Sequence, residues 1–110
     1  MAEPNPKKPE DVAPAIIEDL DAGRADAAHA RLGATIGAMP PQTLLARWKQ
    51  AADGLGARGP IERTASSQQK GLAAFTHVVK FEKGSVEVTS SVNLKTLKAE
   101  GFWVKRLTAR

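Results

Sequence analysis

Residues 85–94, Ser-Val-Glu-Val-Thr-Ser-Ser-Val-Asn-Leu, alternate between apolar or small side chains and polar ones. Successive side chains of a β-strand point to opposite faces of a sheet, so this pattern predicts a strand with one buried face and one wet face. A helix repeats every 3.6 residues and cannot use a period of two. The chain must therefore contain a sheet, and the remaining sequence has to supply the layer that covers it.

The second half of the chain provides partners for this strand. Residues 72–81 place Phe75, His77, Val79 and Phe81 on one face, and the short connection that follows predicts a hairpin. Strands are expected at 61–65, 72–81, 85–94 and 102–107. Polar or glycine-containing connections are expected at 66–71, 82–84 and 95–101.

The first half has helical spacing instead. Ile16, Ile17 and Leu20 form an apolar stripe behind Asp11, a capping residue, and predict a helix over 11–22. A second, weaker helix is expected between Gly23 and the Met-Pro-Pro of residues 39–41, since each glycine inside it costs about 1 kcal/mol. A third begins near Pro41 and ends at Gly54, with apolar positions Leu44, Leu45, Trp48, Ala51, Ala52 and Leu55.

This order of elements predicts an α+β domain, with three N-terminal helices packed on one face of a four-stranded antiparallel sheet. The 110 residues suffice for one hydrophobic core and not for two. Residues 1–10 are rich in Pro and Lys and are expected to form a disordered tether. Residues 11–110 are expected to form the single α+β domain.

Three stretches carry a family resemblance: AIIEDLDAGRADAAHARL, MPPQTLLARWKQAADGLG and KAEGFWVKRL. Together they resemble an uncharacterised bacterial family, domain of unknown function 3887, over nearly all of residues 11–107. The resemblance implies a small cystatin-like or nuclear-transport-factor-like fold, found alone in exported proteins or ahead of α/β-hydrolase domains. Its motifs are structural, so it implies no reaction.

The sequence lacks the residues that several kinds of catalytic and metal-binding site require. The chain has no cysteine, which removes disulfides, thiol nucleophiles and thiolate metal sites. It has no Gly-x-Ser-x-Gly motif and no phosphate-binding loop, and its two histidines, His29 and His77, fall on different elements. We therefore expect no metal site and no cofactor. No apolar run approaches the roughly 20 residues of a bilayer-spanning helix, so no membrane span is expected.

An enzymatic hypothesis rests on three strand residues. Folds of this type can enclose a small apolar pocket in which burial separates the pKa values of an acid and a base. Glu62, His77 and Glu87 are the strand residues that could take such roles, although the chain has no tyrosine to act as a hydrogen-bond donor. A buried carboxylate near His77 is the structural requirement of this hypothesis.

The charge distribution supports a second hypothesis, a basic sheet platform that binds single-stranded nucleic acid. Residues 1–55 contain six Lys or Arg against eight Asp or Glu, whereas residues 56–110 contain ten against four. The candidate basic surface is formed by Lys80, Lys105 and Arg106. Strand alternation places Trp103 with Lys105 but Phe102 with Arg106, so only one of the two adjacent aromatics can accompany Lys105.

The preferred hypothesis is a non-enzymatic accessory or interaction domain. Three alanine-rich helices can cover only one face of a sheet, and apolar side chains on the other face favour homodimerisation, or binding of a protein or an apolar ligand. We expect one of Phe102 and Trp103 to meet the helices near Trp48. The Ala-Glu-Pro start and polar tether favour a periplasmic or secreted protein, with a cytoplasmic one as the alternative. The candidate pocket or interface residues are Trp48, Phe75, His77, Phe81, Phe102 and Trp103.

Overall fold

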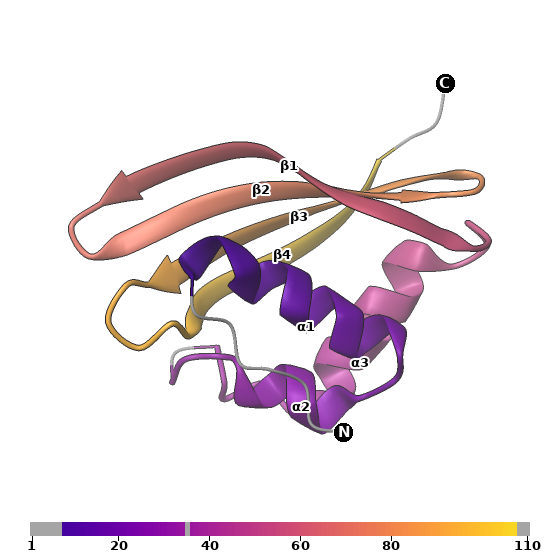
Figure 1. Cartoon of the computed structure of the whole chain (residues 1–110). Coiled ribbons are helices and arrows are strands. Elements are labelled where there is room, and N and C mark those ends of the chain that lie inside the picture. Colours follow the sequence, from indigo (N-terminus) through magenta and orange to yellow (C-terminus); the bar gives the residue numbers. More distant parts are fainter. Residues whose placement is uncertain (1–7, 35, 108–110) are drawn as a thin grey trace.

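Three α-helices precede a four-stranded antiparallel sheet in the computed structural model, which describes residues 8–34 and 36–107. All three helices lie on one side of the sheet, and its other face has no helix over it (Figure 1). This confirms the α+β architecture expected from the sequence. The elements are η1 (Pro9–Asp11), α1 (Val12–Asp21), α2 (Ala25–Ala30), α3 (Pro41–Ala52), β1 (Arg58–Gln69), β2 (Leu72–Phe81), β3 (Gly84–Asn93) and β4 (Ala99–Leu107). No described helix has the length and apolarity needed to cross a membrane.

The strands follow one another in the sheet in the order β1-β2-β3-β4, so each is joined to its neighbour by a hairpin. Along β3 the residues from Val86 to Val92 alternate between buried and partly exposed, as the sequence pattern predicts. β2 and β3 pair without a register shift from Leu72 opposite Asn93 to Phe81 opposite Gly84. The two central strands therefore match the prediction closely.

The first strand is much longer than residues 61–65, and the expected turn over residues 66–71 is wrong. β1 continues to Gln69, which pairs with Leu72, and only Lys70 and Gly71 form the turn. Both have positive φ, 42° and 84°, as the tightest hairpin turns require. Residues 62–70 are all exposed. An edge strand that buries neither face carries no alternation for sequence analysis to detect.

The second helix is shorter than expected, because residues 31–33 leave it and pair with the sheet. Leu32 forms a parallel bridge with Ala99. Gly33 N–H donates to the Ala99 carbonyl (2.7 Å), and Ala99 N–H donates to the Arg31 carbonyl (2.9 Å). The low helix propensity of glycine makes this departure inexpensive.

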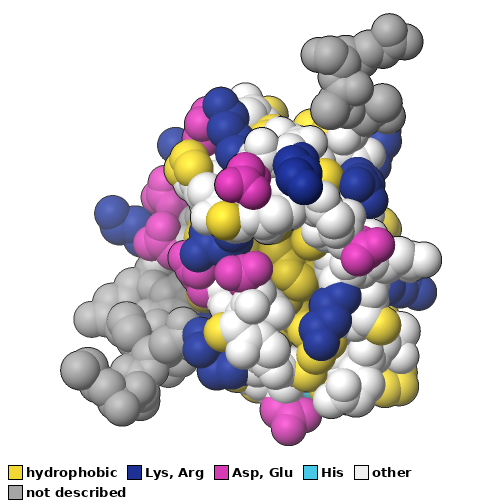
Figure 2. Space-filling view, turned by 90° about the vertical axis from the view of Figure 1, so that its right-hand side faces the viewer, with side chains coloured by type: hydrophobic (Ala, Val, Ile, Leu, Met, Phe, Trp, Pro, Cys, Tyr) yellow, Lys and Arg dark blue, Asp and Glu magenta, His cyan; other side chains and the backbone are white. Residues whose placement is uncertain are grey.

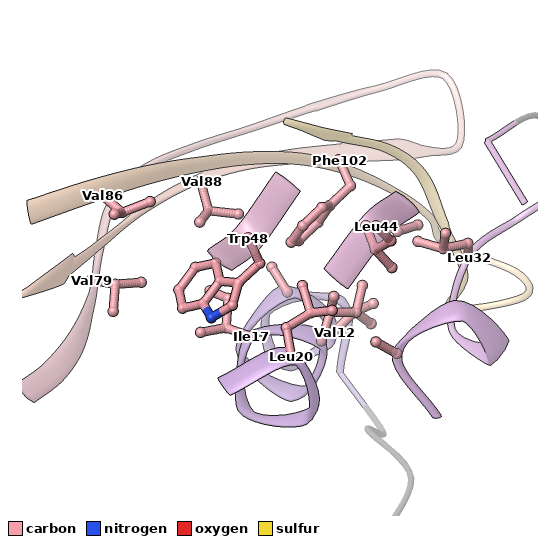
Figure 3. Close-up of a cluster of buried hydrophobic side chains, with 14 of the residues drawn as sticks. Val12, Ile17, Leu20, Leu32, Leu44, Trp48, Val79, Val86, Val88 and Phe102 are labelled. Atoms are coloured by element: carbon pink, nitrogen blue, oxygen red, sulfur yellow. The ribbon is translucent and has the colours of Figure 1, made fainter. Parts of the chain in front are cut away.

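The core lies between the sheet and helices α1 and α3. Figure 3 shows Trp48 of α3 between the valines of β2 and β3 and the α1 residue Ile17, with Phe102 of β4 reaching in beside Leu44. These side chains are all at least nine-tenths buried. α2 packs against α1 and α3 instead of lying directly on the strands.

A buried ion cluster ties both ends of α2 to α1. The Asp19 side chain is fully buried and accepts hydrogen bonds from Arg24 Nε (3.1 Å) and Arg31 Nε (2.9 Å). Near the N-terminus, the expected tether of residues 1–10 falls mostly outside the described residues. Within it, Pro9 to Asp11 form a 3-10 turn, and Glu10 forms an ion pair with Arg63 of β1.

Candidate functional site

The helix-facing side of the sheet contains most of the aromatic residues that the sequence offered as an interface. Phe75 is buried, and Phe81 stacks at a tilt on Trp48 with ring centroids 6.0 Å apart. Phe102 is also buried on this side, near Trp48 as expected. These four residues pack in the core of the domain itself, so they do not form an exposed aromatic surface.

The open face of the sheet is largely polar. Its central positions include Thr76 and Thr89, which pair with each other, and Ser91, two residues further along β3. The large hydrophobic side chains that are exposed in the described chain are Leu72 and Trp103, at 41% and 59%. Of the aromatic candidates, only Trp103 lies on this face, at the sheet margin formed by β4.

Gly101 makes room for the Trp103 ring. The two residues share one face of β4, and a β-carbon on Gly101 would lie 2.4 Å from Trp103 Cη2. The indole therefore lies over the glycine backbone, an arrangement that protects a glycine in an edge strand. The expectation that Gly101 belongs to a turn is wrong, because β4 already begins at Ala99.

A groove runs between the margin of β4 and the outer surface of α3. It has a volume of about 350 Å³ and combines apolar side chains with two arginines. Figure 2 shows hydrophobic side chains gathered in a hollow on the side of the molecule where α3 lies, with charged side chains of both signs around it. The lining residues are Met39, Leu44, Arg47, Gln50, Ala51, Phe102, Trp103, Val104 and Arg106.

His77 is a buried residue of the helix-facing side of β2. Its side chain is 2% exposed, and its Nδ1 has no hydrogen-bond partner within the described part of the chain. Burial, and secondarily the positive charge of Arg63, lower the pKa of His77. Glu62 and Glu87 both pair with Val78 across the sheet, so they lie on the open face, away from His77. The carboxylate that the enzymatic hypothesis requires beside His77 is not supplied by either residue.

The three candidate basic residues do not form one platform. Lys80 Nζ lies 3.1 Å from a carboxylate oxygen of Glu62, and Lys105 sits opposite Glu87 in the register. Arg106 pairs with buried Val86, so its side chain leaves β4 on the helix side and lines the groove. Lys80 and Lys105 therefore share the open face with Trp103, each beside a glutamate, and Arg106 lies on the other side of the sheet.

Arg47 is the site residue that sequence reasoning missed. It precedes Trp48 on α3 and points away from the core stripe, as an exposed helical position does. Its importance comes from the neighbouring margin of β4, about which the helix sequence carries no signal. Gln50 and Ala51, on the same outer surface, were missed for the same reason.

Comparisons with family models, curated proteins and solved structures find no match for this chain. The resemblance to domain of unknown function 3887 therefore stays a prediction. Among the described residues, no group of three or more His, Asp or Glu side chains is arranged to hold a metal ion. The groove beside Trp103 is the feature from which a function can be argued.

Proposed function

We propose that this chain is a non-enzymatic interaction domain that binds a partner protein at the groove beside Trp103. The observation that carries the proposal is the indole of Trp103, which is 59% exposed although its neighbour Phe102 is buried. Tryptophan is enriched among the residues that contribute most to protein–protein binding, because it offers a large rigid surface at low entropic cost. An apolar hollow next to such a side chain is a suitable receptor for a partner's apolar side chain.

The polarity of the remaining open face limits the site to the β4 margin. Thr76, Thr89 and Ser91 have hydroxyl groups that water can solvate, so covering the centre of the face would bury little apolar surface. The proposal therefore places the contact at one edge of the sheet. A homodimer that buries the whole face is the less favoured arrangement.

The surroundings of the other candidate residues support the same choice. His77 is enclosed by core residues, and the two strand carboxylates lie across the sheet from it. Lys80 is paired with Glu62, which reduces its attraction for phosphate. Neither acid–base catalysis nor nucleic-acid binding explains the exposed Trp103 as well as a protein contact does.

A display selection tests the proposal. A library of random short peptides is first depleted of binders to Trp103→Ser and then selected for binding to the wild-type domain. Leu72→Ser is the matched control, because it removes the other large exposed apolar side chain of the same face. We expect clones that bind wild type and Leu72→Ser equally and bind Trp103→Ser at least about tenfold more weakly. Failure to obtain clones that discriminate between these variants contradicts the proposal.

Two further measurements separate the alternatives. Sedimentation equilibrium of the wild type and of Trp103→Ser tests for a dimer. If the wild type self-associates and the variant does not, the site binds a second copy of this chain instead of a different protein. Binding of a single-stranded oligonucleotide that falls steeply with rising salt would assign the surface to nucleic acid. We expect a monomer without such binding.

A further inference from the structure

The outer edge of β4 presents backbone groups that the sheet does not use. Ala99 directs both its N–H and its C=O away from β3, since they bond to Arg31 and Gly33. Along a strand, residues whose side chains share a face also direct their backbone groups to the same side. A register shift between Ala99 and Gly101 changes the alternation, so Phe102, Val104 and Arg106 share the helix-facing side with Ala99. Their N–H and C=O groups are therefore expected to point outward as well.

The chain itself shows that this edge accepts another strand. Leu32 bridges to Ala99 in parallel orientation, and Gly33 then leaves the sheet. No described residue continues this pairing beyond Ala99. Leu32 therefore occupies the beginning of a fifth-strand position beside β4, and no described residue occupies that position from Gly101 onward.

The two edges of the sheet differ in ways that favour β4. β1 has register shifts between Arg58 and Ile61 and between Arg63 and Ala65, and such irregularities protect an edge from pairing. β4 has one register shift, between Ala99 and Gly101, and pairs with β3 without a shift from Gly101 to Leu107. Its edge also runs along the groove, so an added strand would gain apolar contacts as well as backbone hydrogen bonds.

The charge of the groove indicates the chemistry of its occupant. Its lining contains Arg47 and Arg106 and no acidic residue. Neither guanidinium forms an ion pair with any residue that the structure describes. Two copies paired along β4 would gather four such guanidinium groups in one interface, which disfavours a homodimer there. An acidic partner would satisfy them with charge-assisted hydrogen bonds.

We propose that the groove accepts an extended acidic segment of a partner protein, which adds to the sheet as a fifth strand beside β4. This inference rests on the proposed function and adds the binding mode and the charge of the partner. Alternate apolar side chains of the segment enter between Leu44, Ala51 and Phe102, and its carboxylates bind Arg47 and Arg106. Main-chain pairing gives such complexes their affinity, and the pockets give specificity.

The clones from the display selection on Trp103 supply the probes for the test. We expect their sequences to be enriched in Asp and Glu and to alternate with apolar residues. A peptide synthesised with N-methyl groups on one alternate set of residues should lose binding at least about tenfold, while methylation of the other set should be tolerated. Only a strand with one paired edge and one free edge gives this asymmetry.

Charge reversal tests the arginines against a matched control. The double variant Arg47→Glu/Arg106→Glu should weaken the acidic peptides at least about tenfold. The double variant Lys49→Glu/Lys95→Glu changes net charge equally at exposed positions outside the groove and should leave binding nearly unchanged. Melting temperatures of both variants should stay near that of the wild type.

The outcomes distinguish the two proposals. Clones that depend on Trp103 but are neutral or basic, or that tolerate both methylation patterns, overturn the acidic strand while the interaction site stands. Equal effects of the two charge reversals also overturn it, because they show a long-range effect of net charge. If no clone depends on Trp103, both proposals fall.

Discussion

Replacing Asp19 with asparagine should be among the most destabilising single changes at a charged residue of this domain. The carboxylate is fully buried and accepts hydrogen bonds from Arg24 and Arg31, which anchor the beginning and end of α2 to α1. The change removes the negative charge but preserves the shape of the side chain. It therefore isolates the electrostatic contribution of the cluster from packing.

The expected cost follows from the exposure of the two arginines. Removing one partner of a buried ion pair costs about 3–5 kcal/mol, mostly because the remaining charge is left without compensation. The Arg24 side chain is 47% exposed and can be hydrated, whereas that of Arg31 is only 12% exposed. Because only Arg31 is largely buried, we expect a cost near the lower limit, about 3 kcal/mol. For a domain of this size, that lowers the melting temperature by about 12–24 °C.

Urea unfolding followed by the fluorescence of buried Trp48 measures the effect. Asp21→Asn is the matched control, since Asp21 is on the same helix, is 37% exposed and pairs with Arg58 at 3.0 Å. An exposed pair of this kind contributes about 0–1 kcal/mol, and high salt should reduce the effect further. The loss in Asp19→Asn should persist in about 1 M NaCl. If the two variants lose the same stability, the buried cluster does not hold α2 in place.

Three further predictions concern single positions. Burial lowers the pKa of His77, so below about pH 6.5 the unfolded chain binds more protons than the folded one, and the urea midpoint should fall as pH is lowered from neutral to mildly acidic. The urea midpoint of His77→Leu should fall less over the same range, and an equal fall in both proteins would refute this. Lys70→Asn should raise the melting temperature by a few degrees, since asparagine tolerates the positive φ of 42°, and a decrease would contradict the turn geometry. Gly101→Ala should shift the NMR signal of the Trp103 indole N–H but not that of Trp48, because the three atoms nearest to the new methyl group all belong to the Trp103 ring. Unchanged signals would show that the ring does not lie over Gly101.

Sequence periodicity predicted the parts of the fold that bury one face of an element. The alternation along residues 85–94 and the helical stripe around Trp48 each reflect a boundary between core and solvent. β1 has no such boundary beyond Ile61, so its length could not be predicted. The break after Ala30 depends on Leu32 pairing with Ala99, a contact between distant segments that local propensity does not include.

The candidate site could be predicted only in part. Alternation required Phe102 and Trp103 to point to opposite faces, but either aromatic could have filled the core equally well. The register of β3 and β4 places Phe102 in the core, because Phe102 pairs with buried Ser90 whereas Trp103 pairs with Thr89. Arg47 enters the site through the position of α3 beside β4, which no local pattern encodes.

The position of the helices relative to the sheet explains why the hollows at the two edges differ. The groove beside β4 is lined by side chains of α3, whereas a hollow of about 320 Å³ beside β1 is lined mostly by polar side chains. α1 packs on β2, β3 and β4, and α3 packs on β3 and β4, whereas β1 has its main contacts with β2 alone. The helical layer is therefore displaced toward β4, so that α3 borders this edge and β1 extends past the layer on the opposite side. A strand added at β1 would find backbone groups but mostly polar side chains, such as Ser66 and Gln68, to pack on. A strand added at β4 would meet Leu44, Ala51 and Phe102 as well, so the displacement of the helices makes β4 the edge better suited to bind a partner.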